Sequence, residues 1–397
     1  MNALVPIPTY DRLVLPPVPN PDEVATIMIG NRIWQDWTSV SVTHRCEAWP
    51  LFQFTAVERS GAYQIRPFDE CAIYLGGVLA VTGIITVRQV GYDANKHGIQ
   101  IQGKGVTSYA AESSIIDATG NHDGESFEEV AQKILKPFGV GIKTIGELDG
   151  TPFARLQIEP GEKCWDCLER LARPRGIVLG SDHLGNFLLI GPHKSTVIAS
   201  LVEGVNIETM QSVVSIEGVK SEYLLRAQSP ASDDHNGADA NQQEAKVPGT
   251  ARRYSPLLTT AEQPVWSQAE VQARAANESI WHEGAVSVAN IGVQGWLRGP
   301  RELWRIVSDV HVRSPMAMLD EVMSIQTATF TQENGAGTMT TLECVPTFLL
   351  RSNSDYAGLG RLPSAAQDPG VYAATAKPAA PRTSVPEPPP LLLPISV

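Results

Sequence analysis

The feature that most constrains this chain is a run of short alternating segments between residues 24 and 105. Phe52, Phe54 and Ala56 alternate with polar residues, so the apolar side chains share one face of an extended segment. This period of two is typical of a half-buried antiparallel strand. We therefore expect the region to consist of short strands that close, or nearly close, a small barrel.

Two glycines mark the clearest turn in this region. Gly76 and Gly77 separate the apolar segments Cys71–Leu75 and Val78–Val81. A two-residue Gly-Gly connection suits the positive φ angles of a type I′ or II′ turn. The sequence predicts a tight hairpin here.

The pattern of residues 106–200 differs from that of the preceding strands, because sequence signals of helices appear in it. Ser126 and Glu129 have the spacing of a capping box, in which each side chain satisfies a free backbone N–H at the start of a helix. A second helix is expected over residues 162–173 and a hairpin over residues 177–190. We expect a mixed α/β unit.

The alternating pattern typical of strands resumes in residues 201–228 and 286–348. We expect these stretches to pair into a second barrel. Residues 229–285 form an insertion between them. Its polar first part, up to Gly249, is expected to be an exposed loop, and a second capping-box pattern at Ser267 predicts a helix.

Both ends of the chain are rich in proline. Residues 1–23 have the character of an extended arm, and residues 349–397 form a tail that favours polyproline II. The tail carries four apolar side chains near its end, which leaves two readings open, docking onto a partner or a disordered end. These side chains are Leu391, Leu392, Leu393 and Ile395.

Composition limits the class of protein. Hydrophobic residues make up 43% and charged residues 19%, as in ordinary globular proteins, and 397 residues exceed what one core usually holds. The net charge of -12 disfavours a surface that grips DNA phosphates. We expect no signal peptide and no stable membrane association, since no apolar run reaches the ~18 residues that span a bilayer. The five cysteines are too few for a disulfide scaffold.

Cys164 and Cys167 form the sharpest candidate for chemistry, because Cys-x-x-Cys can bind zinc or cycle as a dithiol. There is no second cysteine pair, and His183 and His193 stand at spacings that match no familiar zinc site. Both cysteines lie on one face of an expected amphipathic helix. Packing is the favoured interpretation.

Other catalytic patterns are weak. Gly103-Lys104-Gly105 is followed by no Gly-Lys-Ser or Gly-Lys-Thr, so it forms no P-loop. Four carboxylates could be imagined as a glycosidase pair, but nothing in the sequence places two of them across a cleft. We expect no catalytic residue, no cofactor and no metal. The four carboxylates are Glu112, Asp117, Asp123 and Glu125.

A late block contains Gly295 and Trp296, then Gly299-Pro300, then Trp304, and is expected to be a well-anchored turn between strands. This block and three earlier ones, in the same order, resemble the baseplate hub proteins of Mu-like contractile-tailed phages, the late control D or tail hub family. The earlier blocks are residues 78–85 with Gly83, residues 101–107 with Gly103, and residues 161–186.

The resemblance implies a β-rich α+β fold with two tail-tube-like β-barrel domains, an intervening α/β unit and a helical insertion. It implies a structural, non-enzymatic virion protein of the tail baseplate, assembled in the host cytoplasm. The family forms a homotrimer that adapts the sixfold tail tube to the threefold central spike. The implied partners are the tail tube protein, the central spike protein and other baseplate proteins, with DNA only in passage through the lumen during viral genome ejection. The signature residues, with structural roles, are Gly76, Gly77, Gly83, Gly103, Gly295, Trp296 and Trp304.

Three alternatives remain open from sequence alone. The chain could be a tail-associated cell-wall hydrolase, the equivalent hub of a bacteriocin or secretion particle, or a carbohydrate-binding sandwich of a host-recognition apparatus. The acidic balance of the chain adds a hypothesis to the hub interpretation, that an acidic lumen lets DNA slide.

Overall fold

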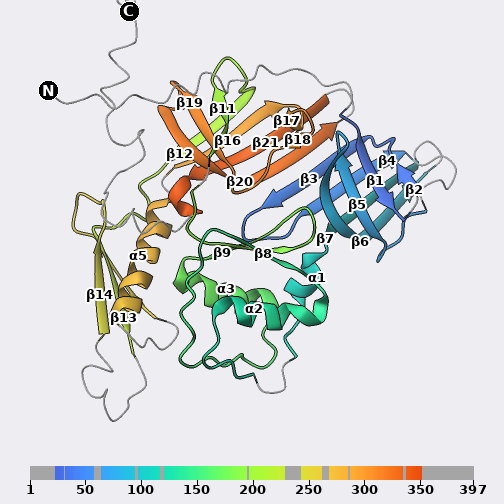
Figure 1. The fold of residues 1–397 in the computed structure, drawn as a ribbon. Coiled ribbons are helices and arrows are strands. Elements are labelled where there is room, and N and C mark those ends of the chain that lie inside the picture. Colours follow the sequence, from blue (N-terminus) through green and yellow to red (C-terminus); the bar gives the residue numbers. More distant parts are fainter. Residues whose placement is uncertain are drawn as a thin grey trace, which may run out of the picture.

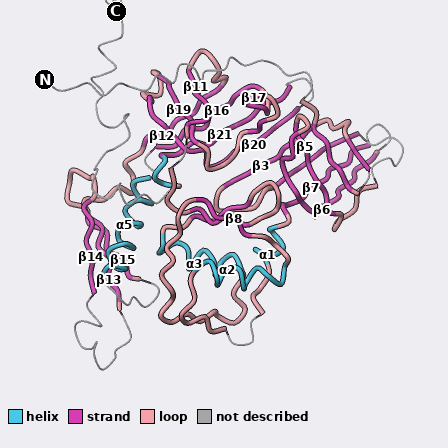
Figure 2. The backbone as a smooth tube through the Cα atoms, viewed as in Figure 1, coloured by secondary structure: helices cyan, strands magenta, loops and turns pink. Residues whose placement is uncertain are grey.

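The structure is a computed structural model that describes residues 23–30, 32–57, 64–93, 97–116, 120–194, 196–228, 243–261, 268–284, 287–333 and 337–350. Its largest part is a 13-stranded sheet with an α/β unit packed against it, and a small inserted sheet packs on the helix of the insertion, to one side (Figure 1). Helices are confined to the α/β unit and the insertion, apart from short turns (Figure 2). The fold is therefore β-rich with few helices, as the sequence predicts.

The first half of the large sheet follows the order β3-β4-β7-β6-β5-β1-β2. Gly76 and Gly77 have φ angles of 56° and 74°, which confirms the predicted tight turn between β5 and β6. The strands are β1 (Ala25–Ile29), β2 (Arg32–Trp34), β3 (Ser39–Arg45), β4 (Leu51–Val57), β5 (Glu70–Leu75), β6 (Val78–Tyr92) and β7 (His97–Gly105).

The second half follows the order β12-β16-β21-β20, with β19 paired to β20 and β11 to β19. A separate two-stranded hairpin, β17 (Leu297–Gly299) with β18 (Glu302–Leu303), contains the Gly-Pro turn. The strands of the sheet are β11 (Val197–Val202), β12 (Thr209–Val214), β16 (Ser287–Gln294), β19 (Asp309–Ser314), β20 (Leu319–Glu333) and β21 (Gly337–Pro346).

The two halves repeat one topology. The spatial order β1-β5-β6-β7-β4-β3 in the first half corresponds to β11-β19-β20-β21-β16-β12 in the second, and the paired strands follow each other along the chain in the same sequence. The correspondence has two exceptions. Strand β1 pairs antiparallel with β5 whereas β11 pairs parallel with β19, and β2, which pairs with β1, has no counterpart among the described strands of the second half. The chain thus carries two copies of one strand arrangement.

The halves are joined edge to edge. Strand β3 of the first half pairs antiparallel with the second part of β20, from Thr327↔Arg45 to Glu333↔Ser39. One continuous core cluster fills both halves, with Phe54 and Phe330 among its largest buried members. The sheet is therefore one packed body (Figure 1).

Neither half closes into a barrel through the strand pairs of the described residues. In the first half, β2 and β3 are the two ends of the strand order and do not pair with each other. The sequence predicts two barrels. The structure has two β-rich halves in the predicted regions, but neither is closed by the described strands. The strong twist of strands and the bulges in β6 and β20 curve each half without joining its edges.

The α/β unit combines helices with a small sheet in the order β8-β10-β9. Helix α2 begins with the predicted capping box, because Ser126 accepts from the Glu129 backbone and the Glu129 carboxylate accepts from the Ser126 backbone. The elements are α1 (Thr107–Glu112), α2 (Phe127–Leu135), η2 (Lys136–Phe138), β8 (Ile142–Ile145), α3 (Cys164–Ala172), η3 (Arg173–Arg175), β9 (Val178–Ser181) and β10 (Phe187–Ile190).

Both faces of this small sheet are buried. Phe187 and Leu189 pack with α2 and α3, whereas Leu188 and Ile190 pack against residues of the second half such as Val345. This explains why β10 is apolar at every position rather than alternating. The unit lies below the large sheet in Figure 1 and is fixed to it by this second cluster.

The insertion differs from the sequence-based division of the chain. Residues 243–248 form a strand, where a loop was expected up to Gly249, because Gln243, Ala245 and Val247 are buried and their neighbours are not. Strand β13, expected in the second barrel, pairs instead with β14 and β15. The helix is present, but Ser267, its predicted cap, lies outside the described residues. The elements are β13 (Glu222–Ala227), β14 (Gln243–Pro248), β15 (Pro256–Thr260) and α5 (Gln268–Gly284), and η4 (Thr347–Leu349) follows β21.

Candidate functional site

The signature glycines Gly83 and Gly103 make room for one aromatic ring. Phe52 on β4 is paired with Gly103 on β7, and a Cβ at position 103 would lie 2.1 Å from its Cζ atom and 2.4 Å from the Ile84 carbonyl oxygen. A Cβ at Gly83 would lie 2.7 Å from the same ring. Two small residues therefore let Phe52 lie flat on the inner face of the sheet.

Gly295 and Trp296 form a second structural group with a carboxylate from the start of the first half. The backbone N–H groups of Trp296 and Leu297 donate to Oε1 of Glu23, over 2.8 and 3.0 Å, and the Thr338 hydroxyl donates to Oε2. Glu23 is buried, so these bonds form in a medium that strengthens them. They attach the beginning of the first half to the turn after β16.

The signature tryptophans are core residues, as the sequence predicts. Trp296 is fully buried, and its Nε1 donates to the carbonyl oxygen of Thr331 at 2.9 Å. Trp304 is also buried in the cluster that fills the large sheet. At Gly76, a Cβ would lie 3.1 Å from Leu297 Cδ1, so the β5–β6 turn contacts the β17–β18 hairpin.

Polar groups are buried where the α/β unit meets both halves. His44 on β3 is buried edge-on against Phe330, and burial lowers the pKa of its ring to about 3, with the charges of Arg305 and His183 acting in the same direction. Arg305 donates to the Leu79 carbonyl oxygen at 2.8 Å, and burial also lowers the pKa of its guanidinium. Burial at this junction keeps the His44 ring uncharged near neutral pH, so the ring can pack between the units as a neutral group.

The carboxylates considered for hydrolysis have structural partners instead. Glu112 pairs with Lys104, and Asp123 accepts from the Leu156 backbone N–H at 2.7 Å. Glu125 accepts from Lys133 and lies 3.0 Å from His122, and these contacts hold its pKa below the usual range. A general acid needs the opposite shift, so Glu125 does not have the character of a glycosidase acid. Asp117 lies outside the described residues.

Cys164 and Cys167 lie side by side on the buried face of α3. Both are fully buried in the core of the α/β unit, and burial raises the pKa of their thiols to about 11 and about 12. These are packing residues, as the sequence indicates. Across the described part of the chain, no group of three or more His, Cys, Asp or Glu side chains is placed to hold a metal ion.

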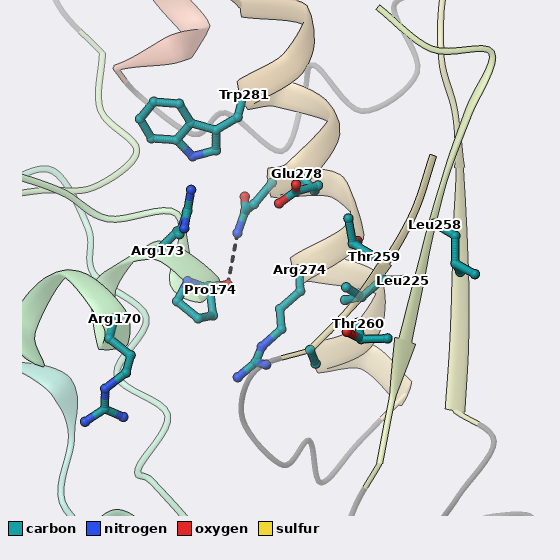
Figure 3. Close-up of a pocket in the computed structure, with 12 residues that line it drawn as sticks. Arg170, Arg173, Pro174, Leu225, Leu258, Thr259, Thr260, Arg274, Glu278 and Trp281 are labelled. Atoms are coloured by element: carbon teal, nitrogen blue, oxygen red, sulfur yellow. Dashed lines mark hydrogen bonds between the residues drawn. The ribbon is translucent and has the colours of Figure 1, made fainter. Parts of the chain in front are cut away.

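An arginine-lined cleft of about 480 Å³ lies between the insertion and the α/β unit (Figure 3). Arg170, Arg173 and Arg274 stand on its walls, Trp281 lies at one end, and Leu258 belongs to the opposite sheet. Most of this charge is already engaged. The hydrogen bonds to Glu162, both 2.7 Å, raise the pKa of Arg170, and Arg274 lies 3.7 Å from Glu270.

The cleft is bridged at one point. The side chain of Asn277 on α5 donates to the carbonyl oxygen of Pro174 at 3.0 Å, the bond drawn in Figure 3. This contact fixes the insertion helix against the end of α3. The cleft thus has the character of a packed seam between two units, with charged walls around an apolar floor.

Sequence reasoning missed two exposed strand edges. These are the second edge of β12, which no described strand covers, and the distal part of β6, and they expose apolar side chains such as Val213 and Tyr92. The unusual length of β6, 15 residues, was the available signal, because the expected hairpin needs only its first part.

The four apolar residues of the predicted docking tail, Leu391, Leu392, Leu393 and Ile395, lie outside the described residues, as does the N-terminal arm up to residue 22. No described helix has both the length and the apolar character required to cross a bilayer.

Comparisons with known families match two consecutive parts of the chain. Residues 24–105 match the family model described as Mu phage baseplate assembly protein GpP-like, N-terminal. Residues 107–191 match the model described as baseplate hub protein gp44-like, second domain. A comparison with curated proteins gives no match.

Three solved structures of tail proteins are similar to this chain. The 43 kDa tail protein of prophage MuSo2 from Shewanella oneidensis is 26% identical with a TM-score of 0.72, over 83% of this chain and 99% of that one. The tail protein from Neisseria meningitidis MC58 is 19% identical with a TM-score of 0.71, over 82% and 97%. Prophage tail protein gp18 from Listeria monocytogenes is 12% identical with a TM-score of 0.53, over 81% and 94%. The last two show the fold alone.

These matches confirm the resemblance to Mu-like baseplate hub proteins that the sequence blocks indicate.

Proposed function

We propose that this chain, a structural protein of a phage-type tail or baseplate, is the hub ring of a contractile tail, non-enzymatic and trimeric. Three chains with two halves each place six equivalent strand modules around a lumen, each half being a tail-tube-like module. This arrangement adapts a sixfold tail tube to a threefold central spike. The hub contacts the tube protein on one side, and the spike and other baseplate proteins on the other.

The observation that carries the proposal is the internal repeat. One chain contains two copies of the same strand order, joined edge to edge through β3 and β20 in one continuous sheet. A joint that rotates one module onto the next in the same sense closes a ring when the rotation completes a circle. Closure also covers sheet edges that would otherwise aggregate.

Charge supports the role of the ring as a passage. A chain with a net charge of -12 has no general attraction for DNA phosphates, so a lumen formed by it lets DNA slide during genome ejection. A salt-dependent, tight association of the purified protein with duplex DNA is the result that contradicts this part of the proposal.

The oligomeric state tests the hub function directly. We expect sedimentation equilibrium to give a mass of three chains, and negative-stain images to show a ring with a central opening. The same measurement with the spike protein present should give a stoichiometric complex. A strict monomer under both conditions overturns the proposal.

The non-enzymatic part has its own test. Purified protein added to cell walls should leave their turbidity unchanged, and a variant with Glu112→Gln should behave in the same way. Clearing of the suspension by the parent protein, lost in Glu112→Gln, would identify a hydrolase.

A further inference from the structure

The joint between the two halves defines a pattern of contacts within one chain. Beyond the bulge between Ile325 and Thr327, one edge of β20 pairs with β3 over the whole length of β3. Phe330 and Val42 face each other and are both buried in the common core. On the outer face, the hydroxyls of Thr43 and Thr329 are 3.2 Å apart.

Strand β6 is the counterpart of β20 in the first half. Both strands have 15 residues, both have a bulge near the middle, and both pair along one edge with the strand that follows. The bulge of β6 lies between Ile85 and Val87, so Val87 corresponds to Thr327. The other edge of β6 pairs with β5 only up to Ile84, and no described strand pairs with it further on.

The distal part of β6 is accordingly exposed. Val87, Val90 and Tyr92 have exposed fractions of 42%, 45% and 79%. In the second half, Phe330, the counterpart of Val90, is 1% exposed because β3 covers it. An unpaired strand edge that exposes apolar side chains is a template for pairing with another chain.

Strand β12 is the counterpart of β3. It pairs with β16 as β3 pairs with β4, which makes Val213 the counterpart of Thr43 and Val214 the counterpart of His44. Val213 and Val214 are 53% and 38% exposed, whereas His44 is 6% exposed. No described strand covers the second edge of β12.

We propose that β12 of one copy pairs antiparallel with residues 87–92 of β6 in the next copy, repeating between chains the β3–β20 joint found within the chain. Transferring the in-chain register sets Gln89 opposite Val213, Val90 opposite Ser212, and Gly91 opposite Gln211. The two edges lie on opposite sides of the large sheet and towards opposite ends of its strand order (Figure 1). The proposed contact is therefore heterologous and continues from copy to copy. This inference rests on the proposed ring function and specifies its interface.

Register makes the proposal testable, because a shift by one residue turns a side chain to the other face of the sheet. Gln89 and Val213 correspond to Thr329 and Thr43, whose side chains touch in the chain itself. Oxidation of the double variant Gln89→Cys/Val213→Cys should therefore give disulfide-linked dimers and closed trimers on non-reducing gels. A mixture of the two single variants should give dimers only.

Two controls separate register from general proximity. Thr43→Cys/Thr329→Cys should form its disulfide within one chain. Gln89→Cys/Ser212→Cys places the sulfurs on opposite faces and should link on the order of tenfold less. The five native cysteines are buried and do not compete. Circular dichroism of each variant verifies that it folds as the parent does.

The outcomes distinguish this interface from the ring itself. If the parent protein is trimeric but Gln89→Cys/Val213→Cys forms no link between chains, the pairing is wrong and the ring proposal stands. A link within one chain also overturns the pairing, because another part of the same chain would then bring the two edges together. If the parent is monomeric at every concentration and with the spike, both proposals fail.

Discussion

The ring of Phe52 occupies the space above Gly103 on the neighbouring strand, so that position 103 has no room for a side chain. The contact lies in the core of the first half. The carbonyl oxygen of Ile84 lies on the other side of this space, so an added Cβ could not avoid the ring by moving away from it.

Gly103→Ala should therefore destabilise the protein by about 1–3 kcal/mol, as overpacking of a rigid core does. Gly98→Ala on the same strand is the matched control, because the nearest atom to its Cβ is 3.9 Å away. Urea denaturation compares the two. The double variant Phe52→Leu/Gly103→Ala should recover part of the loss, and equal stabilities of Gly98→Ala and Gly103→Ala would contradict this account.

Glu23→Ala should weaken the attachment of the first half to the turn at Gly295. Two backbone N–H groups lose a buried, charged acceptor, which corresponds to a loss of about 1.5–3 kcal/mol. Thr338→Val removes only the contact to the other carboxylate oxygen and should cost less. Tryptophan fluorescence during urea denaturation reports both variants, and an unchanged midpoint for Glu23→Ala is the contrary result.

The burial of His44 predicts that acid lowers the stability of the folded protein. Its pKa is about 3 in the folded protein and 6.5 as the ordinary value, so between these values the unfolded chain binds a proton that the folded chain does not. Stability should fall as pH decreases through this window, by about 1.4 kcal/mol per pH unit from this group. His44→Gln should have a flatter pH dependence between pH 6.5 and 4. Val42→Ala, which removes buried methyl groups but no titratable group, should keep the parent's slope.

Cys164 and Cys167 should resist thiol reagents in the folded protein. Burial raises the pKa of both thiols and shields them from solvent, and both effects suppress the reactive thiolate. Absorbance after addition of a disulfide reagent should rise slowly in native buffer and rapidly in urea. Rapid labelling of the native parent, absent in Cys164→Ala/Cys167→Ala, would show an accessible dithiol.

Local elements could be predicted from the sequence because their causes are local. The Gly76–Gly77 turn and the Ser126 capping box each depend on residues within a few positions, and the structure confirms both. Strand β14 was missed because its exposed positions are two charged residues and a proline, and the buried Ala245 and Val247 are a weak signal between them.

Contacts between distant segments could not be predicted in this way. The partner of Glu23 lies 273 residues later in the chain, and the hydroxyls of Thr43 and Thr329 are 286 residues apart. Nothing in the local pattern of either partner specifies the other. The edges of β6 and β12 that no described strand covers are recognisable only once the two halves can be compared strand by strand.

The insertion is present in only one of the two equivalent halves, between β12 and β16. Any closed assembly in which the halves alternate would thus carry the β13–β15 sheet and α5 at every second position. The inner wall could then keep nearly uniform spacing while the outer surface had half as many repeats. A partner with the lower symmetry could bind these protruding units, while the strands that line the centre stay the same.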